Sequence, residues 1–318
     1  MSSAKAYRVS DGRPAGGRLA LIRKDFKKNR LIYLLAVLGV SYYLIFHYWP
    51  MYGAMIAFKT YKPSLGIWGS PWVGLENFMS FFKSVFFFRL VRNTATISVL
   101  ELIFAFPAPI ILALLLNEIR HSGFKRIVQT ITYIPHFISI IVVCGILVDF
   151  LSYNGLFNNI IVSMGGSRTI FLLDPKYFRT IYVSSGIWQH VGWGTIIYLA
   201  ALSNIDLELY DAAVVDGAGR LRQTWHVTLP GILPTIMILL ILRIGNIMSV
   251  GHEKILLLYN ANTYETADVI STYVYRRGLL GGDFSFASAV GLFNSVINFS
   301  LLILANKTSK KMTDSSLW

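Results

Sequence analysis

The feature of this sequence that most constrains its fold is a series of apolar runs, each about as long as a membrane is thick. A helix needs about 20 mainly apolar residues to cross a bilayer. The runs are Leu31–Tyr52, Ala95–Leu116, Ile127–Phe150, Ile181–Leu202, Ile232–Val250 and Ala287–Leu304. They predict an all-α membrane protein with six transmembrane helices.

The composition indicates that lipid, rather than water, surrounds most of this chain. Of its 318 residues, 54% are hydrophobic and 14% are charged, whereas about a quarter of the residues of a soluble domain are charged. A net charge of +13 could indicate nucleic acid, but a nucleic-acid binder gathers its basic residues on one face of a polar domain. Here they lie between the apolar runs. We therefore expect membrane lipid as a partner and no nucleic acid.

The distribution of Lys and Arg predicts the orientation. Basic residues near the ends of spans are enriched on the cytoplasmic side, and the side that holds both termini carries more of them. Both termini should therefore be cytoplasmic. The expected organisation is a basic N-terminal tail over residues 1–30, a membrane domain over residues 31–305 and a C-terminal tail over residues 306–318. Residues 1–18 have little to bury and are predicted to be disordered.

Between the first two runs, Leu75–Arg92 places polar residues near one helical face among several phenylalanines. This pattern predicts a helix that lies in the outer membrane interface. A loop packed on the helix bundle is the alternative.

The segment over residues 203–230, between the fourth and fifth runs, predicts a helix–turn–helix on the cytoplasmic side. Asp211–Val215 favours a short helix, and Gly217 and Gly219 permit a turn that other residues resist. Leu221–Thr228 can form a second short helix before Pro230. Exposed small residues on such a hairpin suit docking into a groove of another protein, although an ordinary loop is the alternative.

This segment resembles the EAA loop of binding-protein-dependent ABC importer permeases. The family pattern is Glu-Ala-Ala, three residues, Gly, nine residues, Ile, one residue and Leu-Pro. The matching residues are Asp211, Ala212, Ala213, Gly217, Val227, Leu229 and Pro230. The spacing agrees at every position, with Asp211 in place of Glu and Val227 in place of Ile.

Other segments are similar to the carbohydrate-uptake branch of that family and to its oligosaccharide and polysaccharide permeases. They are Val73–Phe78, Arg92–Thr94, Tyr133–Pro135, Phe106–Pro109, Leu114–Glu118 and Trp49–Gly53. The resemblance implies a permease in the bacterial plasma (inner) membrane that imports an oligosaccharide or polysaccharide fragment. It also implies a heterodimer with a second permease, two ATPase subunits docked on the loop, and an extracytoplasmic solute-binding protein.

The sequence contains no Gly-x-x-x-x-Gly-Lys-Ser/Thr segment to hold phosphates. We therefore expect no enzyme activity and no cofactor in this chain, with ATP and Mg bound by the partner ATPase subunits. The histidines are scattered and Cys144 is the single cysteine. No metal site is expected, and Cys144 should be a small buried apolar residue.

Polar residues inside the runs are candidates for the substrate path, because lipid makes them costly unless they are paired or line a cavity. They are Trp188, Gln189, Arg243, Asn246, Asn294 and Asn298. Hydrogen bonds between helices are the alternative role. Glu101, in the second run, could pair with Arg243.

The substrate class stays open at this level. Arg243 and the basic outer loops make an anionic polymer such as alginate one candidate. The alternatives are an ABC importer permease for another polar solute and an ion-driven secondary transporter, although such transporters lack an EAA-like loop. A membrane-embedded enzyme would need clustered acids or histidines, which this pattern lacks.

Overall fold

The computed structural model describes residues 25–313 and 316–318, so the predicted disorder of residues 1–18 lies outside the described part. Within these residues the regular structure is helical, and one isolated β-bridge joins Lys59 and Trp72. The chain divides into two units, Met1–Met55 and Ile56–Trp318. The two units are described separately.

The described part of the first unit is a run of helical segments. It contains α2 (Arg30–Tyr43), the π-helical η1 (Leu44–Tyr48), α3 (Trp49–Met51) and the start of the 3₁₀ helix η2 (Tyr52–Phe58). Its apolar side chains are exposed, from Leu31 to Met51. A helix with exposed apolar side chains suits a membrane, since every backbone group is bonded within the helix. The segment Arg30–Phe58 is long and apolar enough to cross one.

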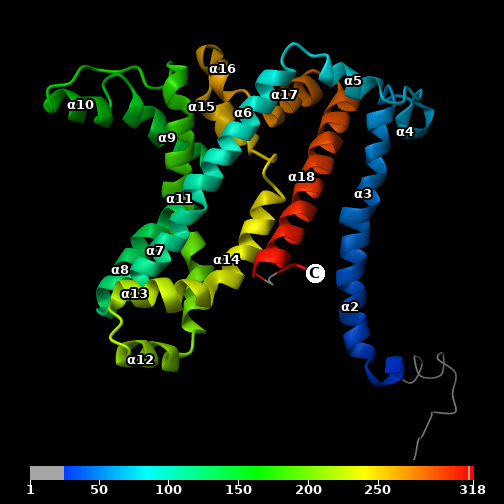
Figure 1. Cartoon of the computed structure of the whole chain (residues 1–318). Helices are drawn as coiled ribbons and strands as arrows, with labels where there is room; N and C mark the ends of the chain where they lie inside the picture. Colours follow the sequence, from blue (N-terminus) through cyan, green and yellow to red (C-terminus); the bar gives the residue numbers. More distant parts are fainter. Residues whose placement is uncertain (1–24, 314–315) are drawn as a thin grey trace, which may run out of the picture. The chain divides into compact units, whose positions relative to one another are not determined.

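The second unit has its longest helices side by side, with short helices at both ends (Figure 1). The long elements are α6 (Phe87–Leu100), η3 (Glu101–Ala105), α7 (Pro107–Glu118), α8 (Ser122–Tyr133), α9 (Ile140–Leu151), α11 (Pro175–Ser203), α14 (Leu229–Ile244) and α18 (Phe284–Thr313). The short elements are α4 (Gly66–Gly69), α5 (Glu76–Phe82), η4 (Ile134–Phe137), α10 (Leu156–Ser163), α12 (Leu207–Val215), α13 (Arg220–Gln223), η5 (Thr224–Thr228), α15 (His252–Leu258), η6 (Ala261–Thr263), α16 (Tyr264–Ala267), α17 (Ile270–Val274) and η7 (Tyr275–Leu280). We call the end that carries α12 and α13 the α12 end, and the opposite end, which carries α15, α16 and α17, the α16 end (Figure 1).

Five segments of the described chain are long and apolar enough to cross a membrane. They are Arg30–Phe58, Phe87–Glu118, Ile140–Ser163, Arg220–Ile244 and Phe284–Lys311. The first, second, fifth and sixth predicted runs fall on four of these segments. The all-α membrane class predicted from the sequence is therefore confirmed.

The third predicted run is not one helix, so the prediction of a continuous span over Ile127–Phe150 is wrong. A 3₁₀ turn, η4, contains Pro135, and Ile138 is extended before Ser139 caps α9. Proline has no backbone N–H and crowds the preceding turn, which interrupts a helix. The apolar run is therefore divided between α8 and α9.

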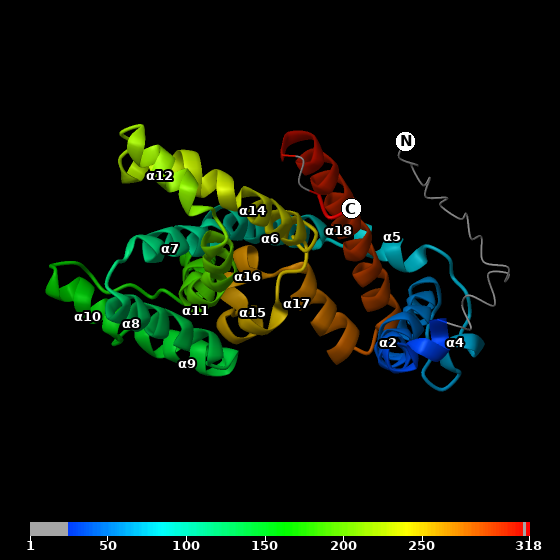
Figure 2. The same cartoon turned by 90° about the horizontal axis from the view of Figure 1, so that it is seen from below.

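The fourth predicted run is the 29-residue helix α11, which is not among the five apolar segments. Polar side chains such as Ser185, Gln189 and Thr195 make it less apolar, and the fold buries them among neighbouring helices. Seen from below, α14 lies on one side of α11, with α8 and α9 on the other (Figure 2). The helix is thus central within its unit.

Two further predicted boundaries differ from the structure. The fifth run was expected to reach Val250, but α14 ends at Ile244. The backbone N–H of Met248 then donates a hydrogen bond to the side chain of Asn298 at 3.0 Å, instead of continuing the helix.

The single interfacial helix over Leu75–Arg92 is also not observed. Instead α5 ends at Phe82 and its Phe81 packs against α18, so the segment packs on the bundle as in the alternative, but as a short helix and not as a loop.

Close packing of α11 depends on glycines that face its neighbours. A Cβ atom added at Gly192 would lie 2.1 Å from the carbonyl oxygen of Thr132 in α8, and one at Gly194 would lie 2.9 Å from Pro109 in α7. Both distances are too short for a side chain, so these glycines allow the helices to meet. Cys144 is buried in the apolar core beside α11, as expected.

Candidate functional site

The segment with the EAA-like spacing folds as a helical hairpin at the α12 end (Figure 1). Asp206 caps α12 by accepting a hydrogen bond from the N–H of Glu208 at 3.0 Å. The chain turns at Gly217, whose φ of 74° lies in the left-handed region that favours glycine. The predicted helix–turn–helix conformation is confirmed. The second helix is longer than expected, because α13 and η5 continue without a break into α14.

Side-chain contacts join the two arms of this hairpin and connect it to α7. The hydroxyl groups of Tyr210 in α12 and Thr228 in η5 lie 3.0 Å apart. Arg220 Nη1, at the start of α13, forms an ion pair with Glu118 Oε2, at the end of α7, at 2.5 Å. The hairpin is therefore joined to α7 by an ion pair and to α11 and α14 through the chain.

The hairpin presents an exposed surface that combines small and apolar residues. Asp211 and Ala212 are exposed on α12, with Ala213 half-buried beside them, and Val215 is 87% exposed. Of the other residues with the EAA-like spacing, Val227 and Leu229 are half-buried and Pro230 is exposed in the first turn of α14. A cleft of about 500 Å³ runs along the surface between Gly217 and His226.

A second candidate feature is a cavity of about 600 Å³ among η3, α7, α11 and α14. Its wall is mainly apolar, with a few polar groups, which is typical of ligand sites. The polar and aromatic lining includes Glu101, His190, Tyr198, Arg243 and Asn246. An adjoining cavity of about 450 Å³ shares Glu101, Gly186 and His190 and adds Gln189, His252, Glu253 and Lys254.

One ion pair lies in the wall of the larger cavity. Arg243 Nη2 lies 2.6 Å from Glu101 Oε2, and both side chains are partly exposed to the cavity. The pairing of Glu101 with Arg243, which the sequence left open, is therefore observed. Lys254, which sequence reasoning missed because it lies between two predicted runs, is buried and lines the adjoining cavity with Glu101. Its ammonium donates a hydrogen bond to the carbonyl of Tyr182 at 2.9 Å.

The remaining predicted path residues lie outside these two cavities. Asn298 Nδ2 donates a hydrogen bond to the hydroxyl of Ser249 at 2.9 Å, and Asn298 also accepts one from Met248. Asn294 precedes it by one turn of α18, and Trp188 is 46% exposed on α11. The structure thus brings Gln189, Arg243 and Asn246 to cavity walls, and places Trp188, Asn294 and Asn298 elsewhere.

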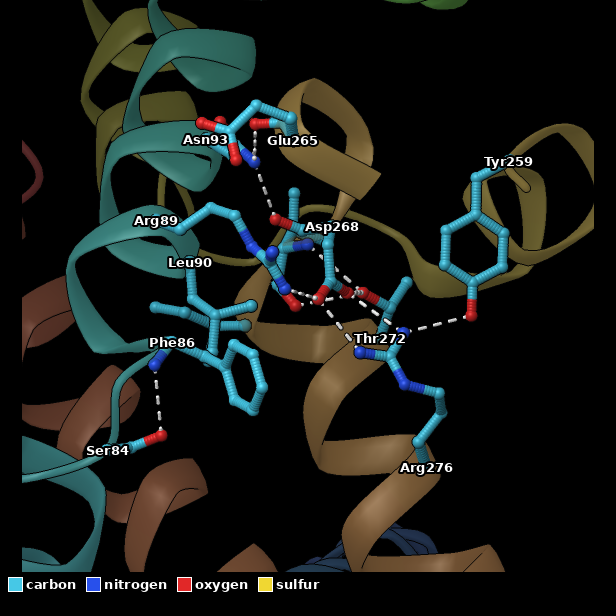
Figure 3. A network of polar contacts seen from close by, with 12 residues as sticks. Ser84, Phe86, Arg89, Leu90, Asn93, Tyr259, Glu265, Asp268, Thr272 and Arg276 are labelled. Atoms are coloured by element: carbon cyan, nitrogen blue, oxygen red, sulfur yellow. Dashed lines mark hydrogen bonds and ion pairs between the residues drawn. The ribbon is translucent and has the colours of Figure 1, made fainter. Parts of the chain in front are cut away.

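A buried carboxylate organises the α16 end, as Figure 3 shows. Asp268 has no exposed surface and accepts hydrogen bonds from Arg276 at 2.8 and 2.9 Å and from Thr272 at 2.8 Å. Arg89 of α6 reaches the same carboxylate at 3.2 Å. The backbone carbonyl of Asp268 accepts from Asn93 at 2.9 Å.

This network ties the chain around α16 to α6 and α11. Asn93 also accepts a hydrogen bond from Arg179 of α11 at 2.8 Å, and Arg92 forms an ion pair with Glu265 at 2.5 Å. Burial lowers the pKa of Arg276, but its hydrogen bonds to Asp268 and Tyr259 outweigh that effect and raise the pKa above its ordinary range. Lys254 is in α15, which comes shortly before the segment that these contacts fix. The network therefore helps to keep Lys254 at the cavity.

Comparison with known proteins identifies the family. Residues 105–313 match the family described as "Binding-protein-dependent transport system inner membrane component". Protein LplB of Bacillus subtilis (strain 168) is 47% identical over 92% of this chain and 92% of its own length. The polygalacturonan/rhamnogalacturonan transport system permease protein YteP of the same organism is 46% identical over 94% of this chain and 96% of its own.

A solved structure supports the same assignment at the level of the fold. The chain is similar to one in the crystal structure of a bacterial alginate ABC transporter in complex with an alginate pentasaccharide-bound periplasmic protein. The identity is 45%, the TM-score is 0.85, and the match covers 92% of this chain and 99% of that chain. This chain therefore belongs to the inner membrane components of binding-protein-dependent transport systems, and it is a transport subunit of an ABC importer whose ATPase is a separate chain.

Proposed function

We propose that this chain forms part of the path through which an ABC importer moves an acidic oligosaccharide or polysaccharide fragment. The observation that carries the proposal is the cavity with the Glu101–Arg243 pair, because its helices α7, α11 and α14 also bear the hairpin at the α12 end. Two of the similar proteins are named for alginate and for polygalacturonan or rhamnogalacturonan, which are polymers that carry carboxylates. A cavity with a basic side chain in its wall suits such a cargo.

In this proposal the chain crosses the inner membrane six times, with both termini in the cytoplasm. The five apolar segments supply five spans and α11 supplies the sixth, because its polar side chains are buried among neighbouring helices. The membrane domain covers residues 31–305, between cytoplasmic tails over residues 1–30 and 306–318. The α12 end is then cytoplasmic, and the α16 end faces the solute-binding protein.

The hairpin over residues 203–230 is the proposed contact with the ATPase subunits. Asp211, Ala212, Ala213 and Gly217 would face the docking groove, and Val227, Leu229 and Pro230 would connect the contact to α14. Two ATPase subunits, a second permease and an extracytoplasmic binding protein complete the assembly. The hairpin suits this role because its small residues are accessible and the Arg220–Glu118 pair links it to α7.

We propose Gln189, Arg243 and Asn246 as the residues of this chain that line the path. Each lies in a cavity wall. For Asn298 the hydrogen bonds to the α14–α15 connection favour a packing role. Trp188 and Asn294 stay candidates for the portion of the path that the second permease would complete.

Reconstitution tests this function. The chain would be assembled with its partner permease, ATPase subunits and binding protein in proteoliposomes. ATP-dependent uptake would be measured for galacturonate and mannuronate oligosaccharides beside neutral oligosaccharides of equal length. We expect uptake of an acidic oligosaccharide. Uptake limited to neutral sugars or to another polar solute would refute the acidic substrate and favour the alternative cargo.

A further inference from the structure

The two cavities meet at a wall that carries the ammonium group of Lys254. Glu101, Gly186 and His190 line both cavities, so the spaces adjoin. A Cβ atom added at Gly186 would lie 3.5 Å from Lys254 Nζ. Because Gly186 has no side chain, the ammonium group lies directly at the shared wall.

Two cations lie near one acid at this wall. Arg243 pairs with Glu101 at 2.6 Å, and Lys254, which is 8% exposed, interacts electrostatically with the same carboxylate without forming an ion pair. Burial lowers the pKa of Lys254 to about 8, while the nearby groups Cys144 and Glu101 act in the opposite direction. Glu253 also lines the smaller cavity, but it is exposed, and no ion pair joins it to these groups in the part of the chain that the structure describes.

The same wall has hydrogen-bonding capacity that the described protein does not use. An ammonium group has three N–H donors, and for Lys254 the structure shows one bond, to the carbonyl of Tyr182. Gln189 donates from Nε2 to the carbonyl of Ile138 at 3.2 Å. Its Oε1 is buried with no hydrogen-bond partner among the described residues. An unpaired buried acceptor is costly, and a ligand hydroxyl would satisfy it.

We propose that Lys254, Arg243 and Gln189 form a subsite for one uronate residue of an acidic oligosaccharide. The ammonium and guanidinium groups bind the carboxylate, and Gln189 Oε1 accepts a hydrogen bond from a sugar hydroxyl. Each cavity, at about 600 and about 450 Å³, is within the range of about 300–1,000 Å³ that is typical of ligand sites. This subsite deepens the proposed function and rests on it.

Glu101 has a definite part in this arrangement. In the absence of cargo its carboxylate balances the two cations, which would otherwise be unpaired in a largely apolar wall. When cargo arrives, the uronate carboxylate competes with Glu101 for Arg243 and accepts from the remaining N–H donors of Lys254. Transport requires binding that is favourable enough for entry and weak enough for release. An internal carboxylate keeps the subsite within that range.

A purely structural role of Lys254, fastening α15 to Tyr182, is the competing explanation, and two substitutions separate the roles. Lys254→Gln keeps an N–H donor and removes the charge, whereas Lys254→Arg keeps the charge. Lys176, an exposed lysine near the start of α11, supplies the control Lys176→Gln. Each variant would be reconstituted as the complete complex with the binding protein and a galacturonate pentasaccharide. Uptake, ATPase activity and yield of intact complex would be measured together.

We expect Lys254→Gln to lower uptake per ATP hydrolysed about 10- to 100-fold, the range for loss of a charge-assisted hydrogen bond. Binding-protein-stimulated ATPase activity and complex yield should persist, Lys254→Arg should restore most uptake, and Lys176→Gln should match the original chain. Unchanged uptake in Lys254→Gln would overturn the subsite and leave the proposed function intact. A fall in yield that accounts for the whole loss of uptake would overturn it too, in favour of the structural role. An original chain that imports only neutral sugars would overturn both proposals.

Discussion

At the scale of single residues, the α16 end depends on one buried carboxylate. The carboxylate of Asp268 accepts hydrogen bonds from two arginines and a threonine, and its backbone carbonyl accepts one from Asn93 (Figure 3). Several strong donors on one carboxylate satisfy a charge that burial would otherwise make very costly. The segment that follows α15 is therefore held by electrostatics as well as by the apolar packing of Val269 and Ile270.

Asp268→Asn should destabilise the assembled protein. Removing one partner from a buried ion pair costs about 3–5 kcal/mol, and somewhat less here because the two guanidinium groups are partly exposed. The melting temperature of the purified complex should fall markedly. Glu265→Gln is the matched control, since its pair with Arg92 is exposed and such a pair contributes only about 0–1 kcal/mol. Equal effects of the two substitutions would contradict the special role of Asp268.

The lowered pKa of Lys254 predicts that stability and uptake respond to pH in opposite directions. Its pKa in the folded protein is about 8, below the ordinary value of 10.5, so between these values the unfolded chain keeps a proton that the folded chain has lost. The stability contribution of Lys254 should therefore rise with pH across that window. Uptake of an acidic oligosaccharide should instead fall as pH rises through about 8, because the cation beside Glu101 is lost.

The measurements are melting temperature and uptake from about pH 7 to about pH 10. In Lys254→Arg the uptake should persist to higher pH, because arginine stays protonated throughout this range. The other titratable groups close to Lys254 are Cys144, Tyr182 and His190. A fall in uptake at the same pH in Lys254→Arg would assign the response to one of those groups.

At the scale of elements, the hairpin at the α12 end is held by local geometry. Gly217 supplies a left-handed turn, and Gln223 donates a hydrogen bond to the carbonyl of Ala218 at 2.7 Å across it. The Tyr210–Thr228 contact joins the two arms of the hairpin, and the Arg220–Glu118 pair joins the hairpin to α7. A displacement of the hairpin would therefore act on α7 and α14 together.

Gly217→Pro and Ala213→Trp should both impair coupling. Proline fixes φ near −65°, which is incompatible with the positive φ of Gly217. Tryptophan at position 213 would overfill a close contact, at about 1–3 kcal/mol. Co-purification of the ATPase and uptake in vesicles at saturating ATP would be measured. Both readouts, or uptake alone, should fall.

Gly219→Ala is the matched control for these hairpin variants. Its φ of −68° suits any residue, and a Cβ atom there meets no atom within 4 Å. We expect ATPase binding and uptake close to those of the original chain. Normal ATPase binding and uptake in Gly217→Pro and Ala213→Trp would show that the hairpin is not the coupling element.

At the scale of the whole molecule, the apolar and polar surfaces are arranged for lipid outside and a cavity inside. Large apolar side chains such as Ile111, Leu115 and Ile141 are exposed on the long helices. The charged pair Glu101–Arg243 instead lies in a cavity wall. Exposed apolar side chains suit contact with lipid, and a charged pair in a cavity wall is what the proposed path requires.

The purified chain alone should bind and hydrolyse no ATP, because its sequence lacks a phosphate-binding loop. Hydrolysis at background level, measured beside the assembled complex, is the expected result. Turnover that persists after contaminating ATPases have been removed would contradict the assignment of this chain as a transport subunit.

The sequence by itself determined the features that depend on local pattern. Apolar runs predicted an all-α membrane protein, because lipid demands long apolar helices. The spacing from Asp211 to Pro230 indicated the hairpin, because a turn after a short helix needs a glycine such as Gly217. Hydropathy could not reveal the break between α8 and α9, because the residues that cause it are mostly apolar.

Only the tertiary structure decided which polar residues meet. Glu101 and Arg243 are 142 positions apart, and Arg89 and Asp268 are 179 apart, so no local periodicity joins them. The same holds for Lys254, which reads as an ordinary loop lysine until the packing of α15 buries it beside Glu101 and Gly186. Charges pair through space rather than along the chain, and a cavity exists only where separate helices leave room between them.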